Sequence, residues 1–561
     1  MASDDARPIV LGLNRTQDAS LCLLRGHEVA LSLQKERLTR SKHHWGALGD
    51  LRLYRSRLPQ LAEPVDLVVE SFSSDPEIAR LAEYRREIEE CLSFRGQPRV
   101  TRVSHHLAHA YSAFHPSPFS EAALMVIDFM GSPVEDVTEP WPGAPGADPR
   151  HVEVGSFYAC GREGISCLGK QLWDRDRSRP AGLGCFYYFL TQAIFPGEGN
   201  EGKVMGLAAY AGAHEIRLPP LRVEGCAVQI PGEWLEVLSQ RGRFGHFSLG
   251  SGSFQECARL AAAGQHAFEE ALLEVSRWLH RQTGAAALCF AGGTALNCVA
   301  NSLLSRHSPF AEVFIPPAPH DGGTALGAAL YGLAEVLGTR PSFRWRTDFL
   351  GTEPDLSGVE GELAVAEDLE WERPGDLVGE VVRRLVSGQV VALYQGRAEL
   401  GPRALGHRSI LADPRVAGMQ DWINSRVKGR EWFRPLAPMV LGEEAPRYFD
   451  IEHPSPWMLF SAAVREEQRA AIPAVVHADG SARIQTVTPK DDDLVHRLLS
   501  AFRRETGCGV LLNTSFNGMG EPLVETPAEA LQCLRATGLH VLAMPPYLIW
   551  KKGPPGQGGL T

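Results

Sequence analysis

Continuous apolar runs that end in polar or glycine-rich tips constrain this chain more than any other feature. Ala122 to Phe129 is apolar as far as Asp128, and Ala285 to Phe290 leads into Gly292 and Gly293. Apolar runs of this length are typical of strands that are buried on both faces of a sheet. Open α/β sheets hold their ligands at the ends of such strands. The sequence therefore predicts an α/β fold with ligand-binding groups at strand ends.

Strand and helix patterns alternate along the rest of the chain. The periodicity fails between Gly338 and Asp355, where Pro, Arg and Trp cluster. We predict a domain boundary there, at about residue 350, which divides the chain into residues 1–350 and 351–561. The other predicted elements are strands at 9–13, 19–24, 28–34, 313–315, 389–394 and 508–512, and helices at about 254–283, 294–305, 324–337 and 374–387.

Charge and cysteine content exclude several classes of protein. Lys plus Arg number 56 and Asp plus Glu number 67, so the net charge of -11 opposes non-specific binding to nucleic acid. The 11 cysteines include no CxxC pair, which indicates reduced thiols rather than disulfides or a zinc knuckle. No signal-like N-terminus and no run of 18 apolar residues occur. We expect a soluble cytoplasmic protein that binds neither nucleic acid nor a membrane.

Two histidines and two aspartates form the first candidate site. His105 and His109 are spaced i, i+4, which places both imidazoles on one face of a helix. Asp128 stands at a strand end and Asp321 in the turn HDGG. Two imidazoles and two carboxylates suit iron, manganese or zinc. The alternatives are that the histidine spacing arises by chance and that Asp321 caps the helix that begins near Thr324.

Two glycine-rich turns form a candidate nucleotide site. Lys203 lies in GEGNEGKVMGLAAY, ahead of a helix of small residues, where it could neutralise a phosphate. In AGGTALN, Gly292 and Gly293 would let a nucleoside approach the backbone, and Asn297 could hydrogen-bond to it. Close packing of a helix on a sheet explains the small residues of the first turn equally well.

The segment from Arg397 to Arg434 is the densest cluster of positive charge. It carries eight Lys or Arg against four acids, interleaved with glycine and proline. Converging Arg and Lys side chains suit phosphate groups, whereas a salt-bridged surface is the alternative. Only eight lysines occur in the chain, which favours a specific role for Lys428. The polar stretch after strand 508–512 offers Asn513 and Ser515 for orienting a small polar substrate.

Six long motifs run in order along both predicted domains: HHLAHA, KVMGLAAY, AGGTALN, GPRALGHRS, INSRVKGREWFRPLAP and NTSFNGMGEP. Together they resemble the NodU/CmcH family of O-carbamoyltransferases. The resemblance implies a ribonuclease-H-like (ASKHA, TsaD-like) N-terminal domain and a YrdC-like α/β C-terminal domain. It further implies that the C-terminal domain makes carbamoyl-adenylate from carbamoyl phosphate and ATP with Mg²⁺. The N-terminal domain then transfers the carbamoyl group to a hydroxyl of a small natural product, as in antibiotic biosynthesis.

The resemblance also assigns roles to residues of this chain, and it is compatible with a homodimer. The implied metal is Fe²⁺, with Mn²⁺ or Zn²⁺ as substitutes, and the catalytic residues expected for adenylate formation are Lys428, Arg403 and Arg434. Together with the analysis of the turns, the site residues are His105, His109, Asp128 and Asp321 for the metal; Lys203, Gly292, Gly293, Asn297 and Asp321 for the nucleotide; and Arg403, Arg408, Lys428, Arg434, Asn513 and Ser515 for carbamoyl phosphate.

Two motifs depart from the family pattern. Gln17 stands where the family usually carries a histidine before Asp-Ala-Ser, and glutamine cannot accept a proton at neutral pH. Asp18 or a metal-bound group is the substitute base that we expect. The sequence DFMGSP, from Asp128 to Pro133, replaces the usual DGxGE. These departures motivate one alternative, a non-catalytic nucleotide- and metal-binding relative, which the intact cationic segment opposes.

A second alternative is a tRNA threonylcarbamoyladenosine-type enzyme. It would need a basic surface for tRNA, and the net charge of -11 argues against it.

Overall fold

The computed structural model describes residues 7–72, 81–240 and 252–552. The chain divides into two compact units. Unit 1 comprises Met1–Thr39 and His43–Trp345, and unit 2 comprises Arg40–Lys42 and Arg346–Thr561. Within the described residues, no helix is long and apolar enough to cross a membrane.

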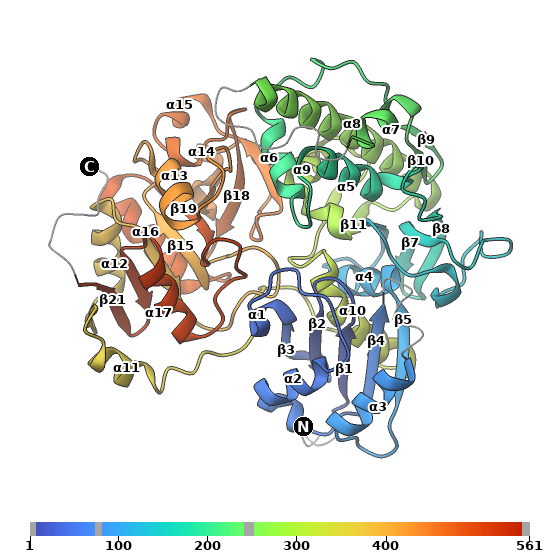
Figure 1. The fold of residues 1–561 in the computed structure, drawn as a ribbon, viewed down its shortest axis with the longest axis horizontal. Coiled ribbons are helices and arrows are strands. Elements are labelled where there is room, and N and C mark those ends of the chain that lie inside the picture. The colour runs from blue at the N-terminus through green and yellow to red at the C-terminus, as the bar shows by residue number, and fades with distance from the viewer. Residues whose placement is uncertain (1–6, 73–80, 241–251, 553–561) are drawn as a thin grey trace. The chain divides into compact units, whose positions relative to one another are not determined.

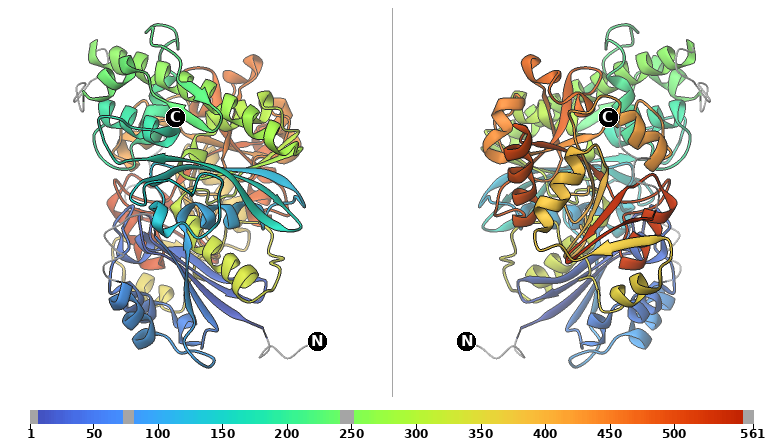
Figure 2. Two further views of the ribbon diagram at one scale, coloured as in Figure 1. Left: turned by 90° about the vertical axis from the view of Figure 1, so that its right-hand side faces the viewer. Right: turned by 90° about the vertical axis from the view of Figure 1, so that its left-hand side faces the viewer.

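The first sheet of unit 1 contains five strands in the order β3-β2-β1-β4-β5 (Figure 1). Neighbours β1, β2 and β3 are antiparallel, whereas β4 runs parallel to β1 and β5 parallel to β4. The apolar run that predicted the first strand is buried along its whole length. The blue strands of this sheet run side by side in both views of Figure 2. The strands are β1 (Ile9–Asn14), β2 (Ser20–Arg25), β3 (Glu28–Gln34), β4 (Leu67–Phe72) and β5 (Val100–Ser104).

The second sheet repeats the topology of the first. Its order is β8-β7-β6-β11-β12. Strand β7 is antiparallel to both β8 and β6, whereas β11 runs parallel to β6 and β12 parallel to β11. The two predicted apolar strands form its centre, β6 and β11, and every residue of both is buried. The strands are β6 (Ala122–Ile127), β7 (Val152–Gly161), β8 (Gly164–Trp173), β11 (Ala287–Ala291) and β12 (Glu312–Phe314).

Helix α10 (Thr324–Tyr331) packs against both β1 and α4 (His105–Phe114). Its small residues allow a very close approach, because a Cβ on Gly327 would lie 1.8 Å from the carbonyl oxygen of Ala108. All ten residues of α4 are buried. The position of α4 therefore depends on the absence of a side chain at one position of α10.

The remaining helices of unit 1 include a long one, α8 (Gly252–Thr283), which lies against α5 and α6 (Figure 1). A short hairpin is formed by β9 (Arg222–Glu224) and β10 (Ala227–Gln229). The other helices are α1 (Lys35–Thr39), α2 (Asp50–Arg57), α3 (Leu81–Cys91), α5 (Gly182–Ile194), α6 (Glu201–Ala208), α7 (Gly232–Leu238) and α9 (Cys298–His307).

Two predicted helices differ from the structure in form. The helix predicted at 294–305 is a 3-10 turn, Gly293–Leu296, followed by α9, because the side chain of Asn297 accepts a hydrogen bond from Ala300 and starts a new helix. The helix predicted at 324–337 ends as an α-helix at Tyr331 and continues as a π-helical turn, Gly332–Val336.

Unit 2 is built on a nine-stranded mixed sheet in the order β13-β21-β20-β14-β15-β19-β16-β18-β17. Strands that are far apart in sequence lie side by side, as the pairing of β13 with β21 shows (Figure 2, right). The strands are β13 (Leu369–Glu372), β14 (Val391–Tyr394), β15 (Arg408–Ala412), β16 (Ala437–Leu441), β17 (Phe460–Ala463), β18 (Ser481–Val487), β19 (Val510–Ser515), β20 (Val541–Met544) and β21 (Tyr547–Lys551).

Helices with strongly apolar faces cover this sheet, and α12 packs against α16. Each of these two begins at an aspartate whose side chain accepts a backbone hydrogen bond, Asp376 for α12 and Asp492 for α16. The helices are α11 (Val359–Val365), α12 (Leu377–Val386), α13 (Met419–Trp422), α14 (Ala445–Tyr448), α15 (Glu466–Arg469), α16 (Asp493–Thr506) and α17 (Pro527–Ala536).

A short N-terminal segment, Arg40–Lys42, belongs to unit 2 although its neighbours in sequence belong to unit 1. The guanidinium of Arg40 donates to the carbonyl oxygens of Leu523 at 2.5 Å and Pro522 at 2.9 Å. It also lies 3.3 Å from a carboxylate oxygen of Glu529. A boundary drawn at one point in the sequence therefore misses part of unit 2.

Candidate functional site

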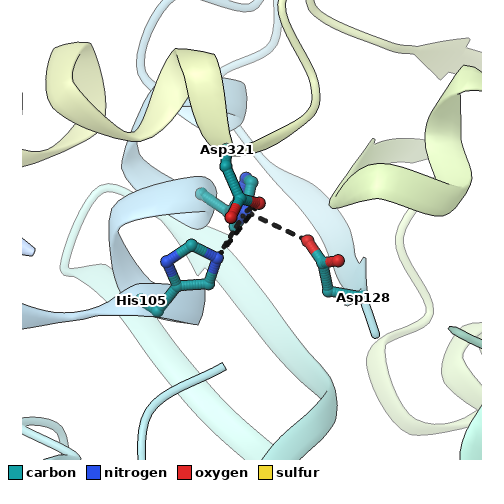
Figure 3. A group of neighbouring side chains, drawn as sticks. His105, Asp128 and Asp321 are labelled. Carbon is teal, nitrogen blue, oxygen red and sulfur yellow. Dashed lines mark hydrogen bonds and ion pairs between the residues drawn. The ribbon is translucent and has the colours of Figure 1, made fainter. Parts of the chain in front are cut away.

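The four residues predicted to hold a metal lie together in unit 1. His105 is the first residue of α4 and His109 lies one helical turn further on. Asp128 follows the last residue of β6, and Asp321 begins the 3-10 turn Asp321–Gly323 ahead of α10. Figure 3 shows His105, Asp128 and Asp321 pointing toward one another. The four side chains thus come from three separate parts of unit 1: the start of a helix, the end of a strand and a turn.

The distances within this group match those around one divalent cation. His109 Nε2 lies 3.3 Å from Asp128 Oδ2 and 3.5 Å from Asp321 Oδ1. His105 Nε2 lies 3.3 Å from the same oxygen of Asp321 and 3.1 Å from His109 Nε2. Ligands that bind a tetrahedral ion at about 2.0–2.2 Å are about 3.3–3.6 Å apart. The donor set of two imidazoles and two carboxylates therefore fits iron, manganese or zinc.

Opposite charges stabilise each other inside this group. Burial disfavours a charged imidazole at His109, but the hydrogen bonds and charges of Asp128 and Asp321 outweigh it and raise the His109 pKa to about 9. Burial likewise opposes the charge of Asp321, yet His105 and His109 hold the pKa of Asp321 well below its usual range. The carboxylates thus create a negative potential that favours a cation at this point.

The backbone around the four residues keeps them in place. Asp128 Oδ2 accepts a hydrogen bond from the amide of Gly293 at 3.0 Å. Gly292 has a φ of 94°, and a Cβ there would lie 2.2 Å from the carbonyl oxygen of Ile127. The hydroxyl of Ser132 accepts a hydrogen bond from the amide of His105 at 2.8 Å. Gly292 and Gly293, predicted as nucleotide-binding, thus also hold the backbone beside Asp128.

Lys428 is the most constrained cation of unit 2. Its buried ammonium donates to the carbonyl oxygen of Ser515 at 2.6 Å and to its hydroxyl at 3.0 Å, and to both side-chain and backbone oxygens of Asn517. Burial, with the charges of Arg430 and Arg434, places the pKa of Lys428 well below its ordinary value. The prediction that Lys428 and Ser515 share one site agrees with this contact.

Three arginines extend the positive charge around Lys428. Burial and the charges of Arg434 and Arg483 lower the pKa of Arg430 to about 9. Burial also lowers the pKa of Arg434, although Glu431, 3.6 Å away, opposes the effect. We call Lys428, Arg430, Arg434 and Arg483 the cation cluster. Such lowered pKa values mark a place where an anion would be stabilised.

Sequence analysis missed one member of the cation cluster and gave another no specific role. Arg483 comes from β18, outside the cationic segment, and stands in the run SARIQT, which has no motif character. Arg430 was counted within the segment but not assigned to a site. Strand pairing, which brings β18 beside β16, is the information that the sequence pattern lacks.

Two residues predicted to bind carbamoyl phosphate also hold backbone in place. Arg408 is fully buried, with its guanidinium 3.9 Å from the ring centre of Tyr394, and donates to the carbonyl oxygens of Gln395 at 2.6 Å and Gly396 at 3.1 Å. Its Nε and Nη2 atoms are buried without a hydrogen-bond partner among the described residues. The amide of Asn513 donates to the carbonyl oxygen of Ala404 at 3.0 Å. Arg403 is half-buried in the same loop.

Comparison with known proteins decides the family. The domain descriptions "Carbamoyltransferase N-terminus" and "Carbamoyltransferase C-terminus" match residues 242–330 and 382–551. Nodulation protein NolO of Bradyrhizobium diazoefficiens is 34% identical over 80% of this chain and 79% of its own length. The 3'-hydroxymethylcephem-O-carbamoyltransferase of Amycolatopsis lactamdurans is 31% identical over 78% of each chain. The chain belongs to the carbamoyltransferase family. It is therefore an enzyme that transfers carbamoyl groups, as the NodU/CmcH motifs predicted.

Solved structures resemble this carbamoyltransferase only distantly. The crystal structure of HypF from T. kodakarensis matches 59% of this chain and 48% of its own, with 13% identity and a TM-score of 0.37. Similarity at this level does not determine the fold. The α/β character of both units follows from their own sheets and helices.

Two predicted nucleotide-binding residues of the carbamoyltransferase make structural contacts. The side-chain oxygen of Asn297 caps α9, and its amide donates to Gln265 at 2.9 Å. Lys203 lies in α6, with its ammonium 5.6 Å from the ring centre of Phe195. The nucleotide-binding role of both residues stays a prediction.

The carboxylate of Asp18, predicted as a substitute base, lies beside an imidazole. His43 Nδ1 is 2.9 Å from Asp18 Oδ1. The sequence analysis gave His43 no role, because it stands in the irregular stretch SKHHWG, 25 residues from Asp18. Asp18 itself has a φ of 48°, a left-handed conformation that is uncommon outside glycine.

Proposed function

We propose that this carbamoyltransferase uses ATP and carbamoyl phosphate to form carbamoyl-adenylate and transfers the carbamoyl group to a hydroxyl of a small natural product. The observation that carries the proposal is the cation cluster of unit 2. Burial and mutual repulsion oppose the charges of Lys428, Arg430 and Arg434, and a bound anionic partner would stabilise these charges. Phosphate groups of carbamoyl phosphate and ATP supply that partner.

In the first step, the cation cluster would reduce the repulsion between two anionic substrates. Lys428 presents a compact ammonium oriented by Ser515 and Asn517. Arg434 and Arg430 add guanidinium groups, each of which can donate two parallel hydrogen bonds to two oxygens of one phosphate. Stabilising the charge that develops on phosphate oxygens is the main way in which proteins accelerate such transfers. We assign this step to unit 2, as a YrdC-like domain, with Arg403 and Arg434 also in contact with substrate.

Unit 1 would carry out the transfer. Its two sheets share one strand order, which supports the proposed ribonuclease-H-like (ASKHA) duplication. His105, His109, Asp128 and Asp321 would hold Fe²⁺, or Mn²⁺ or Zn²⁺ in its place. A bound cation of this kind supplies positive charge that polarises a carbonyl or neutralises a phosphate. The glycine turn at Gly292 and Gly293, beside Asp128, is where we place the adenylate.

The acceptor class follows from charge and from one relative. The name of the Amycolatopsis lactamdurans enzyme describes carbamoylation of a hydroxymethyl group on a cephem. The net charge of -11 opposes binding of a polyanion such as tRNA. We therefore propose a small hydroxylated acceptor, with antibiotic-type natural products as the first class to screen.

Product analysis tests the proposed function directly. The full chain is incubated with carbamoyl phosphate, ATP, Mg²⁺ and Fe²⁺ under anaerobic conditions, and pyrophosphate, AMP and carbamoylated products are quantified. Pyrophosphate that depends on carbamoyl phosphate supports adenylate formation. Its absence from folded, metal-loaded protein would contradict the proposal. Modified adenosine after incubation with tRNA, threonine, bicarbonate and ATP would instead favour the tRNA-type enzyme.

A further inference from the structure

A second group of titratable side chains lies in unit 1, apart from the four-residue metal group. Asp18, Glu36 and His43 each place a polar atom within 4.8 Å of the others. The ring of His43 contacts Asp18 Oδ1 through Nδ1 at 2.9 Å, and its backbone amide donates to Glu36 Oε2 at 3.0 Å. Carboxylates therefore hold both the ring and the backbone of this histidine.

The contact with Asp18 selects one form of the imidazole. A carboxylate accepts a hydrogen bond, so Nδ1 carries the proton when His43 is neutral. The lone pair is then on Nε2, as in the histidine of a hydrolase triad. A Cβ on Gly199 would lie 2.5 Å from this Nε2 atom, so the ring fits here only because position 199 has no side chain. His43 is thus arranged to accept a proton at Nε2.

Backbone contacts connect this pair to the metal group. The side-chain amide of Asn14 donates to the carbonyl oxygens of Asp18 at 3.3 Å and of Asp321 at 3.1 Å. Asp18 and His43 both have left-handed backbone conformations, with φ values of 48° and 53°. Such conformations are unfavourable for residues other than glycine and persist where the surrounding structure enforces them. The corner of the first sheet therefore holds Asp18 next to the backbone of a predicted metal ligand.

The charged groups that face His43 come from several elements. Asp18 and Glu36 contact it directly, and its charge also acts on Glu201 of α6 and on buried His320. Burial, with the charge of Asp18, raises the pKa of Glu201, whereas His43 opposes that rise. Burial lowers the pKa of His320, so this second imidazole is neutral near pH 7. Two carboxylates, those of Asp18 and Glu36, thus contact His43 directly.

These contacts favour proton transfer over metal binding at this group. Glu36 already accepts from the His43 amide and lies 3.5 Å from the guanidinium of Arg37. A neighbouring guanidinium opposes a second cation. The side chain of His43 is 30% exposed, which allows a captured proton to leave to water.

We propose that His43 is the general base for the transfer step and that Asp18 positions it. This inference rests on the proposed function. The acceptor oxygen forms a bond to the carbonyl carbon of carbamoyl-adenylate, and the bond from that carbon to the phosphate oxygen breaks. AMP leaves with the electron pair, and the hydroxyl proton moves to Nε2 of His43. The imidazole of His43 thus replaces the one that Gln17 cannot provide.

The experiment compares wild type with His43→Gln, His43→Gly and Asp18→Asn in the full, metal-loaded chain. Pyrophosphate reports adenylate formation, and AMP release reports transfer, with water and a 3'-hydroxymethylcephem as probe acceptors. In His43→Gln we expect AMP per pyrophosphate to fall by about 100-fold or more. The decrease in transfer rate that wild type shows at low pH should also be absent from His43→Gln. His44→Gln, one residue away, is the matched control and should retain the wild-type ratio.

Chemical rescue separates a base from a structural residue. Added imidazole should raise AMP release by His43→Gly about tenfold or more, because it supplies the missing proton acceptor. Asp18→Asn should lower kcat with little change in KM for the acceptor. A wild-type ratio in His43→Gln, or a loss with no rescue and an unchanged decrease in rate at low pH, overturns the assignment. Absence of pyrophosphate from wild type overturns the proposed function itself, and the role of His43 with it.

Discussion

The Nε2 atoms of His105 and His109 lie 3.1 Å apart at the start of a helix that is buried along all ten residues. When neither Nε2 carries a proton, both nitrogens direct a lone pair at the same point. The carboxylates of Asp128 and Asp321 approach the same point. A shared cation satisfies all four groups at once.

Replacing one of these ligands should remove the metal. In Asp321→Ala and His105→Ala, affinity for Fe²⁺, Mn²⁺ or Zn²⁺ should fall by at least about 100-fold. Loss of a residue that only hydrogen-bonds to a metal ligand already lowers metal affinity by about 10- to 100-fold. Metal content after equilibrium dialysis, measured by mass spectrometry, checks this. His27→Ala removes an exposed histidine and should bind metal like wild type. Equal metal content in the ligand variants would show that the four residues serve only packing.

Lys428→Met should separate stability from activity. The buried ammonium has a strongly lowered pKa, so an apolar side chain of similar length removes an unfavourable charge. We expect the thermal midpoint to stay level or rise, while pyrophosphate formation falls by about 100-fold or more. Lys490→Met, at an exposed lysine, is the control and should change neither measurement. Near-normal pyrophosphate release by Lys428→Met would exclude the assigned role.

A single added methyl group should disturb the contact between α10 and α4. A Cβ on Gly327 would lie 1.8 Å from the carbonyl oxygen of Ala108, and backbone cannot move away freely. Gly327→Ala should therefore lower the free energy of unfolding by about 2–4 kcal/mol and weaken metal binding. Gly361→Ala, in helix α11 with open space around it, should instead stabilise by about 0.5–1 kcal/mol. Calorimetry of both variants distinguishes the two environments.

Unit 1 should lose stability in mild acid through His115. Burial and the charges of Arg340 and Arg344 lower the pKa of His115 to about 4. Between pH 6.5 and 4 the unfolded chain then binds more protons than the folded one, so stability falls as pH falls. The contribution of neutral His115 to the free energy of unfolding is fully present above pH 6.5 and is on the order of 2 kcal/mol. Its ring stacks on Tyr111 at 4.8 Å, so His115→Phe keeps the stacking and removes the titration.

Urea midpoints at pH 5 and pH 7 measure this effect. The difference between the two pH values should be smaller in His115→Phe than in wild type. An identical pH dependence would mean that other groups cause the acid sensitivity.

The strands and the metal group were predictable because their signals are local. Residues 28–34 were predicted as a strand, and β3 has these bounds. His105 and His109 share a helix, and Asp128 directly follows an apolar strand. The i, i+4 spacing of the histidines and the hydrophobic runs carry this information without any knowledge of tertiary structure.

The parts that depend on distant pairing could not be predicted. Arg483 reaches the cation cluster only through the order of the nine-stranded sheet, and His43 meets Asp18 only through a corner between strands. The shared topology of the two sheets in unit 1 is equally invisible in the sequence, where no repeat of fixed period occurs. The helix-capping contact of Asn297 was not predicted, because it depends on where the preceding turn ends.

The contacts of Arg40 bear on how this protein can be engineered or divided. A gene cut after Trp345 would encode a C-terminal product without Arg40, leaving the carbonyl oxygens of Pro522 and Leu523 without their donor. The loop that lies between Asn517 and Glu529 would lose the hydrogen bonds that Arg40 donates to it. Swapping the C-terminal part between relatives therefore requires co-transfer of a tripeptide encoded more than 300 residues upstream.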